Sequence, residues 1–347
     1  MPDGLPGRRR VVRRRGPLRR AGDATSAVLH DLRLWVAVLG VTVTVLLSAR
    51  LSADMPQLAQ DIAVLTSTTA LAVWLTVRAG GSAYLGGLLA LGLGGAAVVT
   101  REPVLLVGAA VGTATVAAML GLLATAPARR FRDVMREYLL AIGIAVVGGL
   151  TAAGYDAPLS TLRAYYLVVG LSLLGTFALV YKLGAGLHGL GRRGAVMILS
   201  GTLLLFVVLA YTYALSHWGS EELRTALRDL DAGVSGAIGA VPRPGQFLLG
   251  FPALAWGVSQ RARRRQGWWF CAFGAVGLAS VSISVIGVSS LGEGLLAVLY
   301  AAAIGLLLGY AVIRADAYLT GTRGHRARLA EEAAALRPEP PRLAPLM

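Results

Sequence analysis

Reactive side chains are few in the apolar part of the chain. Ser200 and His217 are the residue types that a serine hydrolase uses as nucleophile and general base. His217 stands at a polar end, about a membrane span away from Ser200, so the spacing does not favour a catalytic pair. Paired carboxylates, HExxH, CxxC and a phosphate-binding glycine loop are missing from the sequence. The sequence therefore predicts no catalytic residue, no metal ligand and no cofactor.

A second candidate for chemistry is His30-Asp31-Leu32-Arg33, at the head of the first apolar run. This segment resembles the opening of membrane acyltransferases, which implies a histidine at the end of that run. The stretch from Thr42 to Ser48 contains no histidine. Cys271 is the only cysteine, which excludes an intramolecular disulfide and a cysteine-based metal cluster. We therefore expect that the chain is not an enzyme.

Two groups of hydroxyl side chains are candidates for lining a polar cavity. One group lies in the second apolar run and the other in the ninth. The alternative is that these hydroxyls bond back to their own helix or cross to a neighbour, as serine and threonine commonly do in membranes. The candidate cavity-lining residues are Thr66, Ser67, Thr68, Thr69, Ser280, Ser282 and Ser284.

The segment from Ser220 to Ile238 predicts an amphipathic helix within a polar region of residues 220–240. Ser220 is a suitable N-cap, and the acidic residues that follow it suit the first turn of a helix. An apolar stripe that includes Leu223, Leu227 and Leu230 follows helical spacing. These three leucines could form an outer lid over the bundle, or the helix could lie passively on the membrane interface.

The elements that would position these residues are long apolar runs. The chain has 347 residues, of which 56% are hydrophobic and 15% charged, and this composition is typical of a polytopic membrane protein. We expect an all-α bundle of about ten transmembrane helices. The predicted spans are Leu34–Ser48, Ile62–Thr76, Ser82–Thr100, Val104–Thr125, Tyr138–Tyr155, Tyr165–Tyr181, Ala195–Leu215, Gln246–Ser259, Trp268–Ser289 and Leu295–Ile313.

The distribution of charge predicts the topology. If the N-terminal tail is cytoplasmic, every cluster of basic residues lies inside and most acidic residues lie outside, as the positive-inside rule requires. This count places both termini in the cytoplasm and the amphipathic helix outside, between spans 7 and 8. It depends on Gln246–Ser259, which is short and contains Pro252. A re-entrant segment is the alternative there.

Small residues recur four positions apart in several of the predicted spans, among them spans 4 and 10. Gly108 and Gly112 form a GxxxG pattern in span 4, and Ala301, Gly305 and Gly309 form a stripe in span 10. Such spacing lets neighbouring helices approach closely, so both patterns predict helix–helix contacts.

Three regions are expected along the chain. Residues 1–30 form a basic, disordered cytoplasmic tail that contacts anionic lipid headgroups or simply obeys the positive-inside rule. Residues 31–315 form the transmembrane domain, with possible halves at 31–156 and 157–315. Residues 316–347 are predicted to form a short helix, at about 323–336, followed by disordered residues after Pro338.

The function is reached by elimination. The basic tail has no interleaved aromatic residues, so nucleic acid is not an expected partner. Lys182 is the only lysine beside many arginines, which suggests a GC-rich bacterial genome and hence the bacterial cytoplasmic membrane. Two five-span halves resemble the topology of the drug/metabolite transporter class, and that resemblance implies transport. We expect a permease or exporter of a small or amphipathic molecule, or alternatively a scaffold that binds a protein partner through its outer helix and basic tails.

Overall fold

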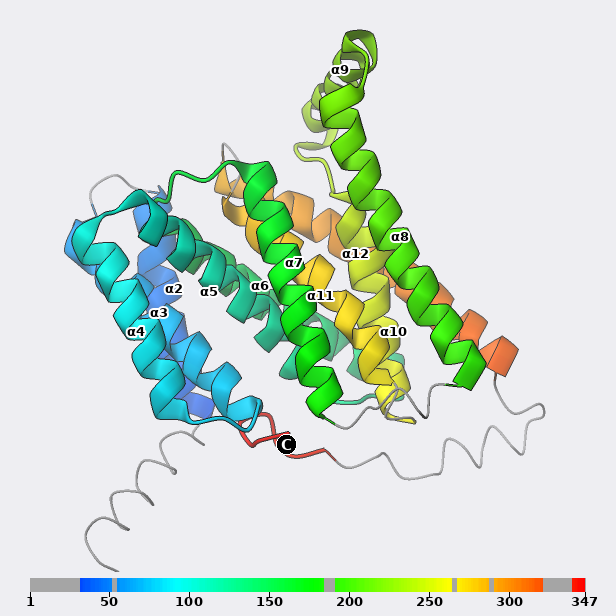
Figure 1. The fold of residues 1–347 in the computed structure, drawn as a ribbon, viewed down its shortest axis with the longest axis horizontal. Coiled ribbons are helices and arrows are strands. Elements are labelled where there is room, and N and C mark those ends of the chain that lie inside the picture. The colour runs from blue at the N-terminus through cyan, green and yellow to red at the C-terminus, as the bar shows by residue number, and fades with distance from the viewer. Residues whose placement is uncertain are drawn as a thin grey trace, which may run out of the picture.

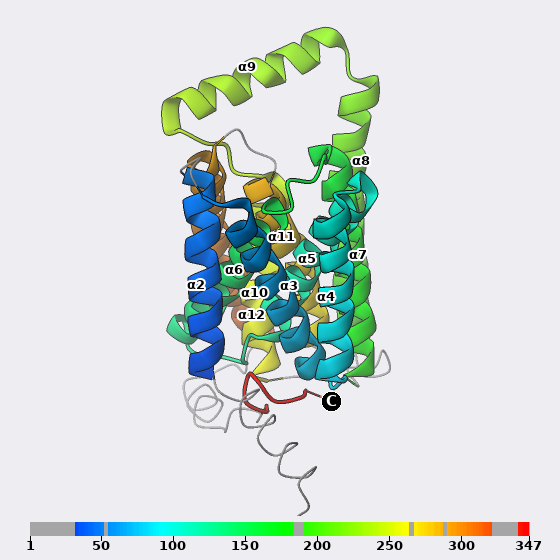
Figure 2. The same cartoon turned by 90° about the vertical axis from the view of Figure 1, so that its left-hand side faces the viewer.

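The regular elements of the protein are all helices. A computed structural model describes residues 32–51, 55–183, 191–263, 267–286, 290–320 and 339–346. Within these ranges no strand occurs, which confirms the all-α prediction. The helices stand side by side as one bundle, and α9 projects from one end of it (Figures 1 and 2). The bounds are α2 (Leu32–Leu51), α3 (Gln57–Arg78), α4 (Ala83–Thr100), α5 (Pro103–Leu123), α6 (Phe131–Ala153), α7 (Thr161–Lys182), α8 (Gly191–Trp218), α9 (Glu221–Ile238), η2 (Gly245–Gly250), α10 (Phe251–Arg261), α11 (Gly267–Ile286) and α12 (Leu291–Thr320).

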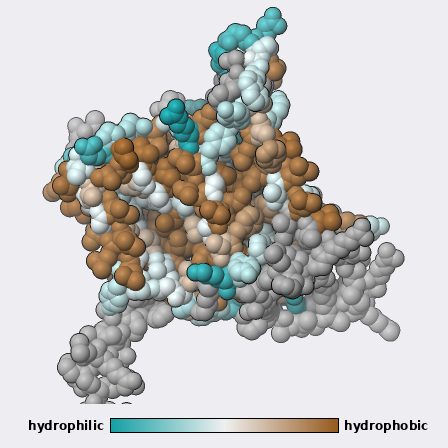
Figure 3. All heavy atoms as spheres, viewed as in Figure 1, coloured by the Kyte–Doolittle hydropathy of each residue, from teal (hydrophilic) through white to brown (hydrophobic). Residues whose placement is uncertain are grey.

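The bundle has the surface of a multi-pass membrane protein. Seven of the described helices are long and apolar enough to cross a membrane: α3, α4, α5, α6, α7, α11 and α12. Shorter apolar helices cover Val36–Leu51 and Leu199–Tyr211. The face shown in Figure 3 is apolar along the bundle, and polar residues gather toward its two ends. Such a band suits a hydrocarbon environment, because lipid tails cannot hydrogen-bond to polar groups.

The helices alternate in direction, and contacts between their ends show this. At the end that carries residues 339–346, here named the tail end, Arg78 of α3 bonds to the carbonyl of Leu123 in α5. At the opposite end, here named the α9 end, Arg50 of α2 bonds to the carbonyl of Ala153 in α6. Figure 2 shows the C-terminal segment and α9 at these two ends.

Most predicted spans fall on single helices with similar bounds. The largest differences are of seven residues each: α12 continues to Thr320 and not to Ile313, and α6 begins at Phe131 and not at Tyr138. The charged residues Arg132, Asp133 and Arg136 lie in its first turns. Hydropathy marks only the apolar part of a helix, so this polar extension was not predicted. The predicted basic N-terminal tail and the short helix at 323–336 lie outside the described residues.

The short predicted span Gln246–Ser259, which contains Pro252, is helical throughout. It begins as the π-helical segment η2 and continues without a break into α10, with Pro252 in the first turn of α10. At ~1.5 Å per residue η2 and α10 together are about 25 Å long. Proline lacks an N–H donor, so a carbonyl in the preceding turn loses its usual helical hydrogen bond. A π-helical turn is one way in which a helix accommodates this loss. Figure 1 shows α10 beside α11 within the bundle.

The predicted amphipathic helix is present as α9. The hydroxyl of Ser220 accepts a hydrogen bond from the amide of Leu223 at 3.2 Å, so Ser220 is the N-cap. Gly239 ends the helix in the left-handed conformation, with φ of 81°. At this end of α9 the hydroxyl of Tyr300 in α12 donates to the carbonyl of Ile238 at 2.9 Å. The rest of α9 runs across this end of the bundle (Figure 2).

The helix α11 is the centre of the bundle, and nearly all of its residues are buried. Its partners η2 and α10 approach so closely that a Cβ on Gly250 of η2 would overlap the backbone of Gly277, and one on Gly257 of α10 would overlap Cys271. On the other side of α10, a Cβ on Gly305 would lie 2.6 Å from the Cβ of Phe251. Glycines therefore allow three helices to pack backbone against backbone.

The contacts predicted from small residues are present at α12 and absent at α5. Gly305 and Gly309 both contact α10, as the stripe predicted. A Cβ added to Gly108 or Gly112 would meet no atom within 4 Å, so this pair does not mediate a close helix contact and the prediction for it was wrong. The spacing of glycines shows where close approach is sterically allowed, and only the neighbouring helix decides whether it occurs.

These two kinds of glycine give a matched test. We expect Gly250→Ala to lower the free energy of unfolding by about 1–3 kcal/mol, because the new methyl group has no room between α10 and α11. Gly108→Ala should raise stability by about 0.5–1 kcal/mol, because alanine favours a helix and the site is open. Thermal denaturation of the two purified variants in detergent measures both effects. Equal stability of the two variants would contradict the packing described here.

Candidate functional sites at the two ends of the bundle

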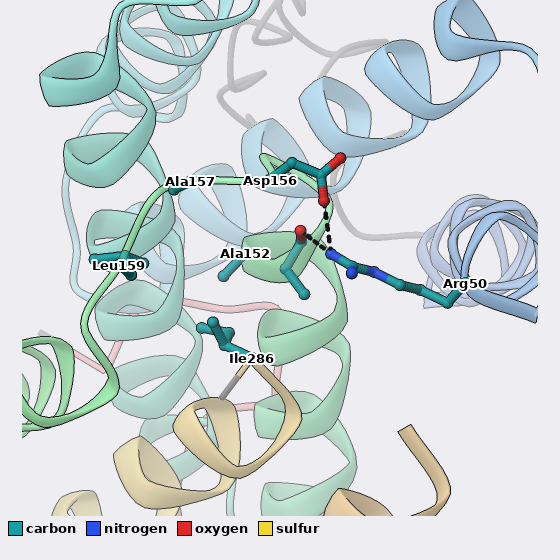
Figure 4. Close-up of a pocket in the computed structure, with 7 residues that line it drawn as sticks. Arg50, Ala152, Asp156, Ala157, Leu159 and Ile286 are labelled. Carbon is teal, nitrogen blue, oxygen red and sulfur yellow. Dashed lines mark hydrogen bonds and ion pairs between the residues drawn. The ribbon is translucent and has the colours of Figure 1, made fainter. Parts of the chain in front are cut away.

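A pocket opens at the α9 end between α2, α6 and α11. It has a volume of about 210 Å³ and is lined by Arg50, Ala152, Ala153, Asp156, Ala157, Leu159 and Ile286. Arg50 reaches across from α2, and its guanidinium pairs with the Asp156 carboxylate at 3.1 Å (Figure 4). Both charged side chains are partly exposed. The pocket therefore offers a small molecule one cationic group and one anionic group.

Asp156 is held in an unusual backbone conformation beside this pocket. Its φ is 48°, in the left-handed region that most residues avoid. The side chain of Gln60 in α3 donates to the carboxylate of Asp156 at 3.2 Å and to the carbonyl of Gly154 at 3.0 Å. Nearby, Arg101 pairs with both oxygens of Asp61, at 2.6 and 2.8 Å. These ionic contacts join the ends of α2, α3, α4 and α6.

The predicted hydroxyls of α3 lie inside the bundle and do not line this pocket. Ser67 donates to the hydroxyl of Thr42 at 2.7 Å. Thr68 lies 3.2 Å from the hydroxyl of Thr113 and 3.0 Å from that of Tyr155. Tyr155 is itself buried, so Thr68 belongs to an internal chain of hydroxyls that satisfy one another. Thr66 and Thr69 are half-buried.

The predicted hydroxyls of α11 are also buried, and each has a hydrogen-bond acceptor. Ser280 and Ser284 donate to carbonyls one turn back in their own helix, at 2.7 and 3.0 Å. Ser282 crosses to the carbonyl of Ala145 in α6 at 3.1 Å. The side chain of Gln246, buried in η2, donates to Ser284 at 3.2 Å. Hydroxyls of this group therefore follow the alternative of local and helix–helix bonding.

Two of the three leucines predicted to form a lid have exposed side chains. Leu223 is 46% exposed and Leu230 is 64% exposed. The side chain of Leu227 lies outside the described residues. The exposed leucines leave α9 free to lie on a lipid surface or against another protein.

At the tail end, Arg78 occupies a position that hydropathy did not single out. Only 1% of this residue is exposed. Its guanidinium donates to Leu123 at 2.9 Å and to three carbonyls of the C-terminal segment, namely those of Pro340 at 3.3 Å, Pro341 at 2.7 Å and Ala344 at 2.9 Å. The amide of Leu346 donates in turn to the carbonyl of Arg78 at 3.0 Å. The segment therefore binds to the very end of α3.

Two ion pairs attach the same segment to other helices. Arg261 of α10, 1% exposed, pairs with Glu339 at 2.5 Å and lies over the ring of Trp268. Arg342 pairs at 2.7 Å with Glu137 of α6, a carboxylate that also accepts from the amide of Ala126 at 2.9 Å. The expectation of a disordered C-terminal end therefore does not hold for residues 339–346.

The buried charged residues at the tail end were not predicted from the sequence, and the reason is identifiable. Arg78, Glu137 and Arg261 stand at the ends of apolar runs, where charged residues are expected to meet water and lipid headgroups. The available signal was in the tail, where Leu343 and Leu346 follow a pair of prolines and are apolar residues in a polar region.

The buried carboxylate at this end gives a second test. We expect Glu137→Gln to lower the free energy of unfolding by about 3–5 kcal/mol, because it leaves Arg342 without its anionic partner and places an amide donor against other donors. Glu102→Gln is the matched control, since Glu102 is exposed, and its effect should stay within about 0.5 kcal/mol. Thermal denaturation of both variants reports the difference. A Glu137→Gln protein as stable as the control would show that the ion pairs of Glu137 contribute nothing to the free energy of unfolding.

Comparison with known proteins adds no relative to this description. No protein-family model, no curated protein and no solved structure matches the chain.

Proposed function

We propose that the chain is a permease of the bacterial cytoplasmic membrane that carries a small polar molecule, and that it crosses the membrane about ten times. Seven helices meet the length and hydropathy of a span. Three further passes are proposed for α2, for α8 and for η2 with α10. The contacts at the two ends of the bundle support the alternation of these passes. The cytoplasmic position of both termini and the outer position of α9 are proposed from the positive-inside rule.

The observation that carries the proposal is the asymmetry of the two ends. At the α9 end a pocket opens between helices, and charged side chains line it. At the tail end, the segment 339–346 lies across the bundle and covers two buried arginines. A transporter that alternates between two open forms has this arrangement when one end is closed.

The pocket also suggests the class of substrate. Its volume of about 210 Å³ is below the ~300–1,000 Å³ of pockets for drug-sized ligands, which favours a smaller molecule over a large amphipathic one. The pairing of Arg50 with Asp156 leaves each group available to exchange its partner for a ligand of opposite charge. A zwitterion such as an amino acid would satisfy both groups together.

A second candidate function is docking of a protein partner through α9. The observation in its favour is the exposure of Leu223 and Leu230 on a helix that stands clear of the bundle. In that case the pocket at the α9 end would have no ligand.

The topology can be tested by cysteine labelling in a Cys271→Ser background. Cysteine at Glu222 should react with an impermeant reagent applied outside intact cells, because α9 is proposed to lie outside. Cysteine at Arg130, in the turn before α6, should react only after the cells are opened. Labelling of position 130 from outside would contradict the proposed orientation.

The substrate can be sought by thermal shift with a panel of amino acids and small carboxylates, followed by uptake into proteoliposomes. We expect at least one compound to raise the Tm of the wild-type protein and to be taken up. Asp156→Asn should abolish both effects, because it removes the anionic group of the pocket. Asp61→Asn is the matched control, since it breaks a neighbouring ion pair outside the pocket and should retain both effects. If no compound shifts the wild-type Tm, the permease proposal fails and docking through α9 is favoured.

A further inference from the structure

The surface that holds the C-terminal segment has the features of a peptide-binding groove. We name it the tail groove and define it by Trp74, Arg78, Ala124, Glu137 and Arg261. These residues come from α3, the end of α5, α6 and α10, so several helices build it together. All five are buried when the tail is in place.

The groove binds the main chain of the segment mainly through donors. Besides the three carbonyls held by Arg78, the carbonyl of Arg342 accepts from the indole N–H of Trp74 at 3.2 Å. Pro340 and Pro341 suit this pattern, because a proline presents a carbonyl and has no N–H that would need an acceptor. Consecutive prolines are also extended before binding, which reduces the entropy lost on docking.

Side chains of the segment then give the groove its selectivity. Glu339 meets a cation, and Arg342 meets an anion and also donates to the carbonyl of Ala124 at 3.2 Å. Between these charges, Leu343 is 7% exposed and packs in a cluster with Leu71 and Trp74. The groove thus recognises an acid, two prolines, an arginine and a leucine in that order.

An empty groove would be unfavourable. Without the segment, the guanidinium of Arg78 would keep only the carbonyl of Leu123 among the acceptors described above. Arg261 would lose its carboxylate and keep the hydroxyl and carbonyl of Thr125. Because unpaired donors of a buried cation cost free energy, these arginines favour either a bound peptide or entering water. Release of the segment is therefore favoured when another peptide replaces it.

We propose that the tail groove is a peptide-binding site whose resident ligand is the chain's own segment Glu339–Leu346, and that this segment exchanges with the same peptide supplied in solution. The site does not depend on the proposed transport activity. If transport occurs, exchange of the segment is the event that opens the tail end.

The test follows one cysteine in the full-length protein, in a Cys271→Ser background. Leu343→Cys reports on docking because residue 343 is buried, and Pro345→Cys is the control because residue 345 is exposed. Cysteine 343 should react with an impermeant maleimide about ten-fold more slowly than cysteine 345. A synthetic peptide with the sequence of residues 339–346 should speed the reaction at 343 and leave that at 345 unchanged. The same peptide carrying Leu343→Asp should have no effect.

Two results would overturn the proposal. If cysteine 343 reacts as fast as cysteine 345 without peptide, the segment is not bound in the groove. If cysteine 343 reacts slowly and saturating peptide does not change its rate, the contact is a permanent part of the fold and the groove is not a binding site. Arg78→Ala in the Leu343→Cys protein adds a second measurement, since loss of the donor should speed the reaction without any peptide. None of these measurements uses an uptake assay, so failure of this proposal leaves the permease proposal standing.

Discussion

The close approach of α10 to α11 is the constraint on which the bundle depends. Gly250 and Gly277 meet with no space for a side chain between them, and α11 is surrounded by other helices. In a lipid environment such contact is a main source of helix association, because apolar side chains gain little by leaving lipid for protein. The position of α10 in turn places Arg261 at the tail end, and the position of α11 places Ile286 beside the pocket at the α9 end.

Charge is distributed over this bundle in two different ways. At the α9 end the ion pairs of Arg50 and Arg101 are partly exposed, and exposed pairs contribute little to stability. At the tail end Arg78, Arg261 and Glu137 are buried, where an unpaired charge would be costly. Because the ion pairs at the α9 end are partly exposed, replacing one partner of a pair by a ligand would cost little free energy. The buried arrangement at the tail end holds the helix ends together through a segment from the far end of the chain.

Much of the fold could be predicted from the sequence, because apolar runs separated by charged turns mark membrane helices directly. The helix α9 was also predictable, since Ser220 and the spacing of its leucines are local signals. The candidate sites were not predictable to the same degree. Thr68 meets Tyr155 only because α3 packs beside the end of α6, and Arg78 meets Pro341 only in the folded chain. Hydropathy assigns each charged residue to a span or a loop and carries no information about such distant pairs.

The bond between Arg78 and Pro341 joins residues that are 263 positions apart. A ribosome makes α3 long before residues 339–346, so the guanidinium of Arg78 meets water or lipid headgroups while the intervening chain is made. The tail end can then be completed only after residues 339–346 have been made. A chain that stops before these residues keeps an uncovered arginine cluster at the tail end, and this difference distinguishes unfinished copies from finished ones.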